Sequence, residues 1–155
     1  MKIRLATETD LPTLARLYQQ TVRVHAPAFY TPAQTAEWAS FGADSQRFRH
    51  FILGVTTYVA EEATGLLGFA GFSGRGHIAS VYVRHDWVRR GIGSRLLARV
   101  LSQAQQQGIT RLYTEASEFS LGLFQKFGFS LYDTEWVDRG GVQFERYLLE
   151  RIQLP

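Results

Sequence analysis

A short segment in the middle of the chain, residues 88–94, has the residue types of an anion-binding loop. Gly91 and Gly93 can bend the backbone tightly and leave no Cβ in the way, so successive N–H groups can converge on a phosphate. The amphipathic run that follows, residues 95–107, predicts a helix whose free first-turn N–H groups and positive dipole end would face the same anion. The segment therefore predicts a pyrophosphate site formed by Val88, Arg89, Arg90, Gly91, Ile92, Gly93 and Ser94.

Two common glycine-rich motifs do not describe this loop. A dinucleotide-binding fingerprint would need a third glycine at position 96, where Leu96 stands, and a P-loop would need Gly-Lys-Ser/Thr after its four-residue gap. Arginines are concentrated nearby, and guanidinium forks suit phosphate oxygens. We expect Arg89 and Arg90, on the loop itself, to contact phosphate. For Arg95 and Arg99 a solvated helix face is an equally good interpretation.

The composition predicts a single domain over residues 1–155, because 45% hydrophobic and 14% aromatic residues can fill one core. No apolar run approaches the ~20 residues that span a bilayer. The first residues lead into an expected strand without the apolar region of a signal peptide, so we expect a cytoplasmic protein with no membrane partner. The sequence has no cysteine, which excludes disulfides, a thiolate zinc site and an acyl-cysteine intermediate. We expect no metal.

The formal net charge of +3 is modest. A nucleic-acid-binding surface would need a basic stripe interleaved with exposed aromatic residues. Such a stripe is interrupted here by Glu61, Glu62, Glu115, Glu118, Asp133, Glu135 and Asp138. We therefore expect no nucleic-acid partner.

Hydrophobic periodicity predicts an α/β domain with alternating helices and strands. An N-terminal strand is expected to bury Ile3 and Leu5. Helices are expected at residues 11–24, 33–41, 44–53, 95–107 and 120–127. Further strands are expected at residues 56–61, 66–72, 77–83 and 111–116, followed by a closing hairpin of residues 129–133 and 142–149.

This order of elements resembles the GCN5-related N-acetyltransferases (GNAT), and the resemblance extends from about Leu5 to Tyr147. Two segments carry it: the R/Q-x-x-G-x-G/A loop between a strand and a helix, and Gln125-Lys126-Phe127-Gly128-Phe129 downstream. Val88 stands where the family usually has Gln or Arg, but family members use this loop mainly through backbone amides, which valine also supplies. The resemblance implies a central mixed, mostly antiparallel sheet of about seven strands flanked by about four helices.

The resemblance also implies an activity. It is that of an N-acetyltransferase that passes the acetyl group of acetyl-CoA to an amine of a small molecule or peptide, by direct attack through a tetrahedral intermediate, as a monomer or homodimer. In the family the fourth strand is bulged and diverges from the fifth, and its backbone holds the pantetheine and the thioester carbonyl; by position these residues are Val81, Tyr82 and Val83. Ser117 stands where the family often has Asn.

The proton-transferring residues depart from the family pattern. Phe124 occupies the position of the family's usual catalytic tyrosine, and a phenyl ring cannot donate a proton. Either Tyr82 or Tyr132 replaces it, or the thiolate leaves unassisted, or the protein is a non-catalytic acyl-CoA sensor. For the general base we expect Glu115, with a structural hydrogen-bond acceptor as the alternative interpretation. His77, on the acceptor side, is the second candidate, because an imidazole titrates in the useful range.

Two aromatic residues complete the expected site. Tyr30 and Trp38, together with Thr31-Pro32, are typical of one branch of small bacterial acetyltransferases within the family. In the family this region lies over the acceptor side of the cleft. The two rings are therefore expected either to form a wall for the acceptor or to pack in the core.

Overall fold

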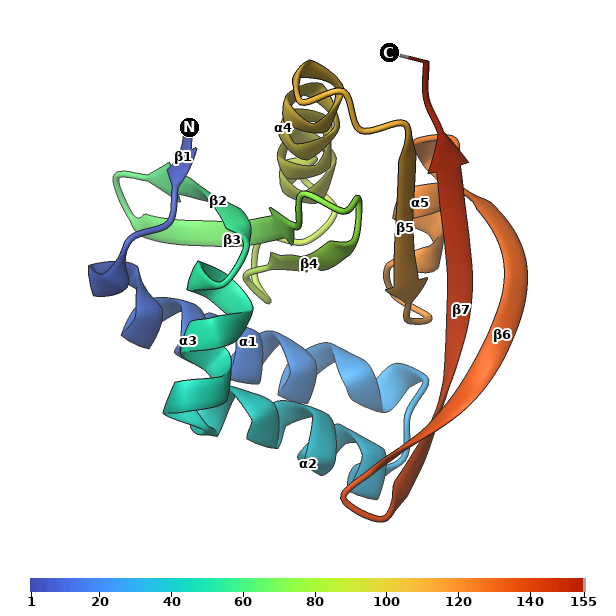
Figure 1. The fold of residues 1–155 in the computed structure, drawn as a ribbon. Coiled ribbons are helices and arrows are strands. Elements are labelled where there is room, and N and C mark those ends of the chain that lie inside the picture. The colour runs from blue at the N-terminus through green and yellow to red at the C-terminus, as the bar shows by residue number, and fades with distance from the viewer. Residues whose placement is uncertain (155) are drawn as a thin grey trace.

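The first half of the fold is an antiparallel sheet with helices on both faces (Figure 1). The structure is a computed structural model that describes residues 1–154. Strands β1 (Lys2–Leu5), β2 (Thr56–Glu62), β3 (Gly65–Phe72) and β4 (Ile78–Val83) pair in that order. Helices α1 (Leu11–His25), α2 (Pro32–Ser40) and α3 (Ser45–Leu53) lie on one side of this sheet, and α4 (Ile92–Gln106) lies on the other. Short 3₁₀ turns at Glu8–Asp10, Ala26–Ala28 and Phe41–Ala43 connect the N-terminal elements.

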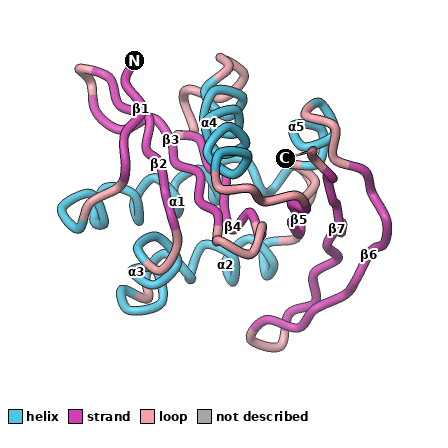
Figure 2. The backbone as a smooth tube through the Cα atoms, turned by 45° about the horizontal axis from the view of Figure 1, so that its top comes forward, coloured by secondary structure: helices cyan, strands magenta, loops and turns pink. Residues whose placement is uncertain are grey.

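The second half is a separate three-stranded antiparallel sheet of order β5-β7-β6. It contains β5 (Arg111–Ala116), β6 (Ser130–Arg139) and β7 (Val142–Ile152), with the short helix α5 (Leu121–Lys126) against one face (Figure 2). Within residues 1–154, the backbone pairing between the two sheets is one parallel bridge of His77 with Tyr113. The seven strands therefore form two sheets that diverge between β4 and β5.

Strand β4 carries the expected bulge. Gly71 pairs with Ser80 but Phe72 pairs with Ile78, so Ala79 is the extra residue on β4. A bulge bends its strand and locally disrupts the ladder, which helps β4 to turn away from β5. The bulge and the divergence are both as the family resemblance predicted.

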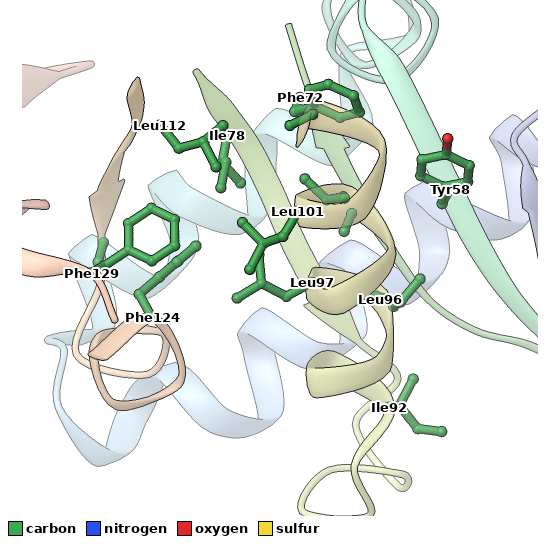
Figure 3. Packing of buried hydrophobic residues seen from close by; sticks show 14 of the residues in the cluster. Tyr58, Phe72, Ile78, Ile92, Leu96, Leu97, Leu101, Leu112, Phe124 and Phe129 are labelled. Carbon is green, nitrogen blue, oxygen red and sulfur yellow. The ribbon is translucent and has the colours of Figure 1, made fainter. Parts of the chain in front are cut away.

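Two hydrophobic clusters hold the helices in place. One lies between the sheets and helices α4 and α5, where Leu97 and Leu101 point toward Phe124 and Phe129 (Figure 3). The other joins α1 and α3 to the opposite face of the first sheet through residues such as Phe48 and Phe69. The two clusters cover the two faces of β4. The part of β4 that they leave uncovered is its edge toward β5.

One expectation about the N-terminal strand was wrong. Ile3 packs against the first cluster, but the Leu5 side chain is 56% exposed. Leu5 is the last residue of an edge strand, where the chain leaves the sheet for the first 3₁₀ turn, so no element covers it. None of the helices in the described chain is both long and apolar enough to cross a membrane.

Candidate active site

A cavity of about 1190 Å³ opens where β4 and β5 diverge. Its walls come from α1 and α2, the loop before α4, β4, β5, the loop after β5, and the β6–β7 hairpin. Most of the residues singled out in the sequence line it: Tyr30, Trp38, His77, Val81, Tyr82, Val83, Val88, Arg89, Gly91, Ile92, Gly93, Ser94, Glu115, Ser117 and Phe124. Arg90 and Tyr132 do not.

The backbone of the glycine loop has the conformation of an anion cradle. Arg89 and Gly91 both have positive φ, 62° and 82°, so the chain turns sharply just before α4 begins. A Cβ on Gly91 would meet no atom of residues 1–154 within 4 Å, so the space above this residue opens into the cavity. In the described chain no side chain caps α4 and no acid lies in its first turn, which leaves its first N–H groups available to an anion.

Gly93 has a different role from Gly91. A Cβ at Gly93 would lie 3.3 Å from Leu123 Cδ2 of α5, closer than ordinary van der Waals contact. The missing side chain therefore lets the first turn of α4 pack against α5. The neighbouring Ile92 is buried and anchors the same turn in the first hydrophobic cluster.

The positive charges around the loop differ from the sequence expectation. The Arg90 guanidinium lies 4.7 Å from the centre of the Trp87 ring and outside the cavity, so the structure does not bring it to the cradle. Arg89 does line the cavity. Lys126 adds a cation that the sequence analysis had used only as part of a motif: its Nζ donates to Ser94 Oγ at 3.2 Å. The sequence did contain a signal for this cation, because Lys126 lies three residues before Phe129, the last residue of the Gly-Phe motif.

Ser117 and Phe124, both expected to contact the cofactor, make contacts with neighbouring residues of the protein. Ser117 Oγ accepts from the backbone N–H groups of Phe119 and Ser120 at 3.2 and 3.3 Å, so it shapes the loop that leads into α5. Phe124 is buried and packs edge-on against Phe129 at 5.1 Å, with its ring at the cavity wall. A phenyl ring suits this apolar position, because a buried hydroxyl would need a hydrogen-bond partner.

His77 and Glu115 form a pair in the cavity wall. His77 immediately precedes β4, its ring packs on Tyr113 at 5.1 Å, and its Nε2 lies 2.9 Å from Glu115 Oε1 on β5. Burial alone would raise the pKa of Glu115, but the hydrogen bond from His77 and the positive charges of Arg146 and Arg139 contribute to lowering it below its usual range. An ionised carboxylate can only accept, so Nε2–H donates, and in the neutral form of the ring Nδ1 carries the lone pair.

The two tyrosines considered as acids lie in different places. Tyr82 lines the cavity, and its hydroxyl accepts from Trp38 Nε1 at 3.2 Å; burial raises the pKa of Tyr82, so it stays protonated at neutral pH. Tyr132 is 51% exposed, and the Arg111 guanidinium lies 5.9 Å from its ring centre. Tyr132 lies at a bulge on the edge strand β6, with β7 between it and β5, and it does not line the cavity. The structure therefore does not support Tyr132 as the acid.

The acceptor side contains residues that the sequence analysis missed. Tyr30 and Trp38 are in edge contact at 5.2 Å, and Phe119, Phe144, Arg139 and Arg146 join them around the cavity. Arg146 pairs with Glu135 through Nη2, whereas its Nε is buried and has no hydrogen-bond partner among residues 1–154.

The β6–β7 hairpin supplies three of the missed residues because its tip reaches α2. Gln34 Nε2 donates to the carbonyl of Gln143 at 2.9 Å across this contact. Strand alternation could have placed Phe144 and Arg146 on one face, but the reach of the hairpin over the cavity has no signal in the sequence.

These features agree with known proteins. A family model described as an acetyltransferase (GNAT) domain matches residues 27–150, and the chain therefore belongs to the GNAT acetyltransferase family. Over an alignment of 164 residues the chain is 29% identical to the L-amino acid N-acyltransferase MnaT of Escherichia coli K12, covering 96% of this chain and 89% of MnaT.

Two solved structures show the same fold. A GCN5-related N-acetyltransferase from Rhodopseudomonas palustris superposes with a TM-score of 0.94 at 24% identity, covering 98% of this chain and 95% of that one. The PaiA N-acetyltransferase from Thermoplasma acidophilum, in complex with coenzyme A, gives a TM-score of 0.80 at 16% identity and covers 99% and 100%. The family and the fold expected from the sequence are thereby confirmed.

Proposed function

We propose that the protein is an acetyl-CoA-dependent N-acetyltransferase and that its acceptor is an amino acid or a similar small amine bearing a carboxylate. The observation that carries this proposal is that one cavity contains both an anion cradle, at residues 89–94, and a hydrogen-bonded imidazole–carboxylate pair, His77 and Glu115. Coenzyme A in the PaiA structure and the name of MnaT support the two halves of the proposal.

The cofactor would be held by backbone and cations. The free N–H groups of the first turn of α4 bind the pyrophosphate, and Arg89 and Lys126 add positive charge beside it. The edge of β4 that turns away from β5 offers the backbone groups of Val81 and Val83 to the pantetheine amides. Acetyl-CoA, when bound, supplies an activated thioester, so direct attack by an amine is sufficient.

The proton transfers would then fall to residues of the diverging strands. His77 accepts the amine proton on Nδ1, directly or through a water molecule. Glu115 positions the imidazole through Nε2 and stabilises the positive charge that the ring acquires. The protonated hydroxyl of Tyr82 is the acid for the departing sulfur, in place of the tyrosine that Phe124 replaces.

The acceptor class follows from two arginines that face this pair. Arg139 and Arg146 both line the cavity and both lie close enough to Glu115 to lower its pKa. Arg146 is paired with Glu135, whereas Arg139 is exposed and forms no salt bridge within residues 1–154, so an anionic group of the acceptor is a natural partner for Arg139. A carboxylate accepts from a guanidinium with good geometry.

The test is a thiol-release assay with acetyl-CoA and matched acceptor pairs, each an L-amino acid and the amine lacking its carboxylate, with the product checked by mass. We expect transfer to the amino acid with kcat/KM at least about tenfold higher than to the amine, a difference of about 1.4 kcal/mol. Arg139→Gln should reduce that ratio without affecting KM for acetyl-CoA.

Two outcomes would count against the proposal. Tight CoA binding without acetylation of any acceptor would identify an acyl-CoA sensor. Equal kcat/KM for amino acid and amine would remove the carboxylate from the proposed acceptor and keep the transferase.

A further inference from the structure

An aromatic subsite lines the acceptor side of the cavity. We define it as Tyr30, Trp38, Phe119 and Phe144, with Phe29 at its rim. Within it, Tyr30 lies 5.2 Å from Trp38, 6.1 Å from Phe119 and 6.3 Å from Phe144, measured between ring centres. The rings come from the α1–α2 region, the loop after β5, and β7, so the tertiary fold assembles them.

The apolar surface of this subsite is left uncovered by the protein. The Phe29 side chain is 61% exposed and Phe119 is 39% exposed, although their rings touch at 5.2 Å. Val24, another exposed apolar residue, lines the same cavity. Apolar area left in water forgoes about 25 cal/mol per Å² of stabilisation, so an apolar ligand group that covers these rings gains affinity.

The polar atoms of the subsite are already used within the protein. The Glu118 backbone N–H donates to Tyr30 Oη at 3.1 Å, and the Trp38 indole N–H donates to Tyr82 Oη at 3.2 Å. The Glu118 carboxylate in turn accepts from Tyr147 Oη at 2.5 Å. What remains for a ligand is mainly ring surface, held in fixed orientation by these bonds.

The subsite also lies next to the proposed reaction centre. Trp38 contacts the Tyr82 hydroxyl, and Phe119 follows Glu115 by four residues along the chain. An acceptor whose amine reaches the His77–Glu115 pair can therefore extend its substituent onto the rings.

We infer that the acceptor carries an aromatic or large aliphatic substituent that binds in the aromatic subsite. This inference rests on the proposed function for the identity of the reaction. The alternative occupant is a cationic substituent, because ring faces also attract cations, and it is an outcome of the test below.

The experiment compares kcat/KM for L-phenylalanine, L-leucine, L-alanine and L-lysine in the wild type and in Phe119→Ala. We expect phenylalanine and leucine to exceed alanine by about 10- to 200-fold, the range that hydrophobic pockets achieve for added methylenes. Phe119→Ala should lower the phenylalanine-to-alanine ratio of kcat/KM by at least about tenfold, while KM for acetyl-CoA stays within about threefold. Phe119→Leu should restore most of that ratio.

The matched control is Trp136→Ala, which removes another exposed aromatic ring, 63% exposed on β6 and outside the cavity. It should leave all four kcat/KM values unchanged. Equal losses with every acceptor, a higher KM for acetyl-CoA in Phe119→Ala, or a preference for lysine would each overturn the inference.

If no amine is acetylated, the proposed function fails but the subsite is still measured by binding. N-acetyl-L-phenylalanine and N-acetyl-L-alanine are titrated calorimetrically into the CoA-loaded protein. Binding of the phenylalanine compound at least about tenfold tighter, lost in Phe119→Ala, supports the subsite. Equal binding of the two compounds overturns it.

Discussion

Glu115→Gln tests whether the carboxylate acts through its charge. The glutamine amide oxygen can still accept from His77 Nε2, so the ring orientation is kept and the negative charge is lost. Unit charges about 4 Å apart interact by about 4 kcal/mol at an effective dielectric constant of 20. Because the side chains of His77 and Glu115 are partly exposed, we reduce this to about 1–2 kcal/mol, which corresponds to a loss in kcat of about 5- to 30-fold.

The assay is steady-state kinetics with both substrates varied. We expect KM for acetyl-CoA to be unchanged, since Glu115 stabilises charge that develops only as the proton moves. Its pKa is lowered in the folded protein, so its effect is present above that pKa and lost only as the pH falls through it. The loss in kcat should thus be full at alkaline pH and should shrink in acid, where the wild-type carboxylate becomes protonated.

A double-mutant cycle of Glu115→Gln with His77→Asn tests whether the two residues act as a pair. If the two residues act as a pair, the double variant should be little worse than His77→Asn alone. Wild-type kcat in Glu115→Gln, or fully additive losses in the cycle, would refute the pairing.

Three further predictions concern the cofactor loop, the N-terminal ion pair and the replaced tyrosine. Gly91→Glu places a carboxylate in the open cradle, so calorimetry should show CoA affinity reduced by more than about tenfold, whereas Gly91→Asn, which tolerates a left-handed backbone, should bind more tightly than the Glu variant. Asp10→Asn removes the charge of a buried carboxylate and one of the two oxygens that accept from Arg4 at 2.8 and 2.9 Å, and urea unfolding at neutral pH should show a loss of about 2 kcal/mol in the free energy of unfolding. Arg4 lowers the pKa of Asp10, so this stability exists above the unfolded-state pKa and disappears as the pH falls through the folded-state pKa; wild type and variant should converge only in acid. Phe124→Tyr should change kcat by less than about tenfold and Tyr82→Phe should lower it, because general acid help comes from elsewhere in the cavity; a large rise with the restored phenol would mean that the wild type lacks an acid.

The parts of the site that the sequence could predict depend on short-range geometry. Gly91 and Gly93 are two residues apart before an amphipathic run, and the left-handed turn, the free helix start and the close contact with α5 all follow from that local pattern. Most strand and helix ranges were similarly close, since periodicity over a dozen residues identifies an element. The exception is β6, which was expected to end at Asp133 and extends to Arg139. The proposed roles of these residues stay predictions until the variants are measured.

The remaining parts depend on contacts between distant segments. Arg90 lies on the predicted loop, but its direction is set by the Trp87 ring beneath it. Tyr132 follows α5 closely in sequence, but it lies at a bulge on β6 with β7 between it and β5, and its ring lies near Arg111 and outside the cavity. Phe119 and Arg146 become part of one cavity only because the β6–β7 hairpin reaches α2, and no local pattern encodes that reach.

The divergence of the two sheets explains why the proposed cofactor groove and the proposed base lie together. His77 and Tyr113 form the last backbone contact between β4 and β5, and beyond it the strands separate. Residues just past that contact, such as Glu115, line the same cavity as the glycine loop, and the separation of the strands leaves the outer edge of β4 free for an extended ligand. A second backbone bridge between β4 and β5 would close the gap between the strands. It would therefore remove both the proposed cofactor groove and the access of an acceptor to His77. In the proposed mechanism the groups that move protons belong to the diverging strands, and α5 is left to pack against α4. On that proposal the fold can tolerate Phe124 at the tyrosine position.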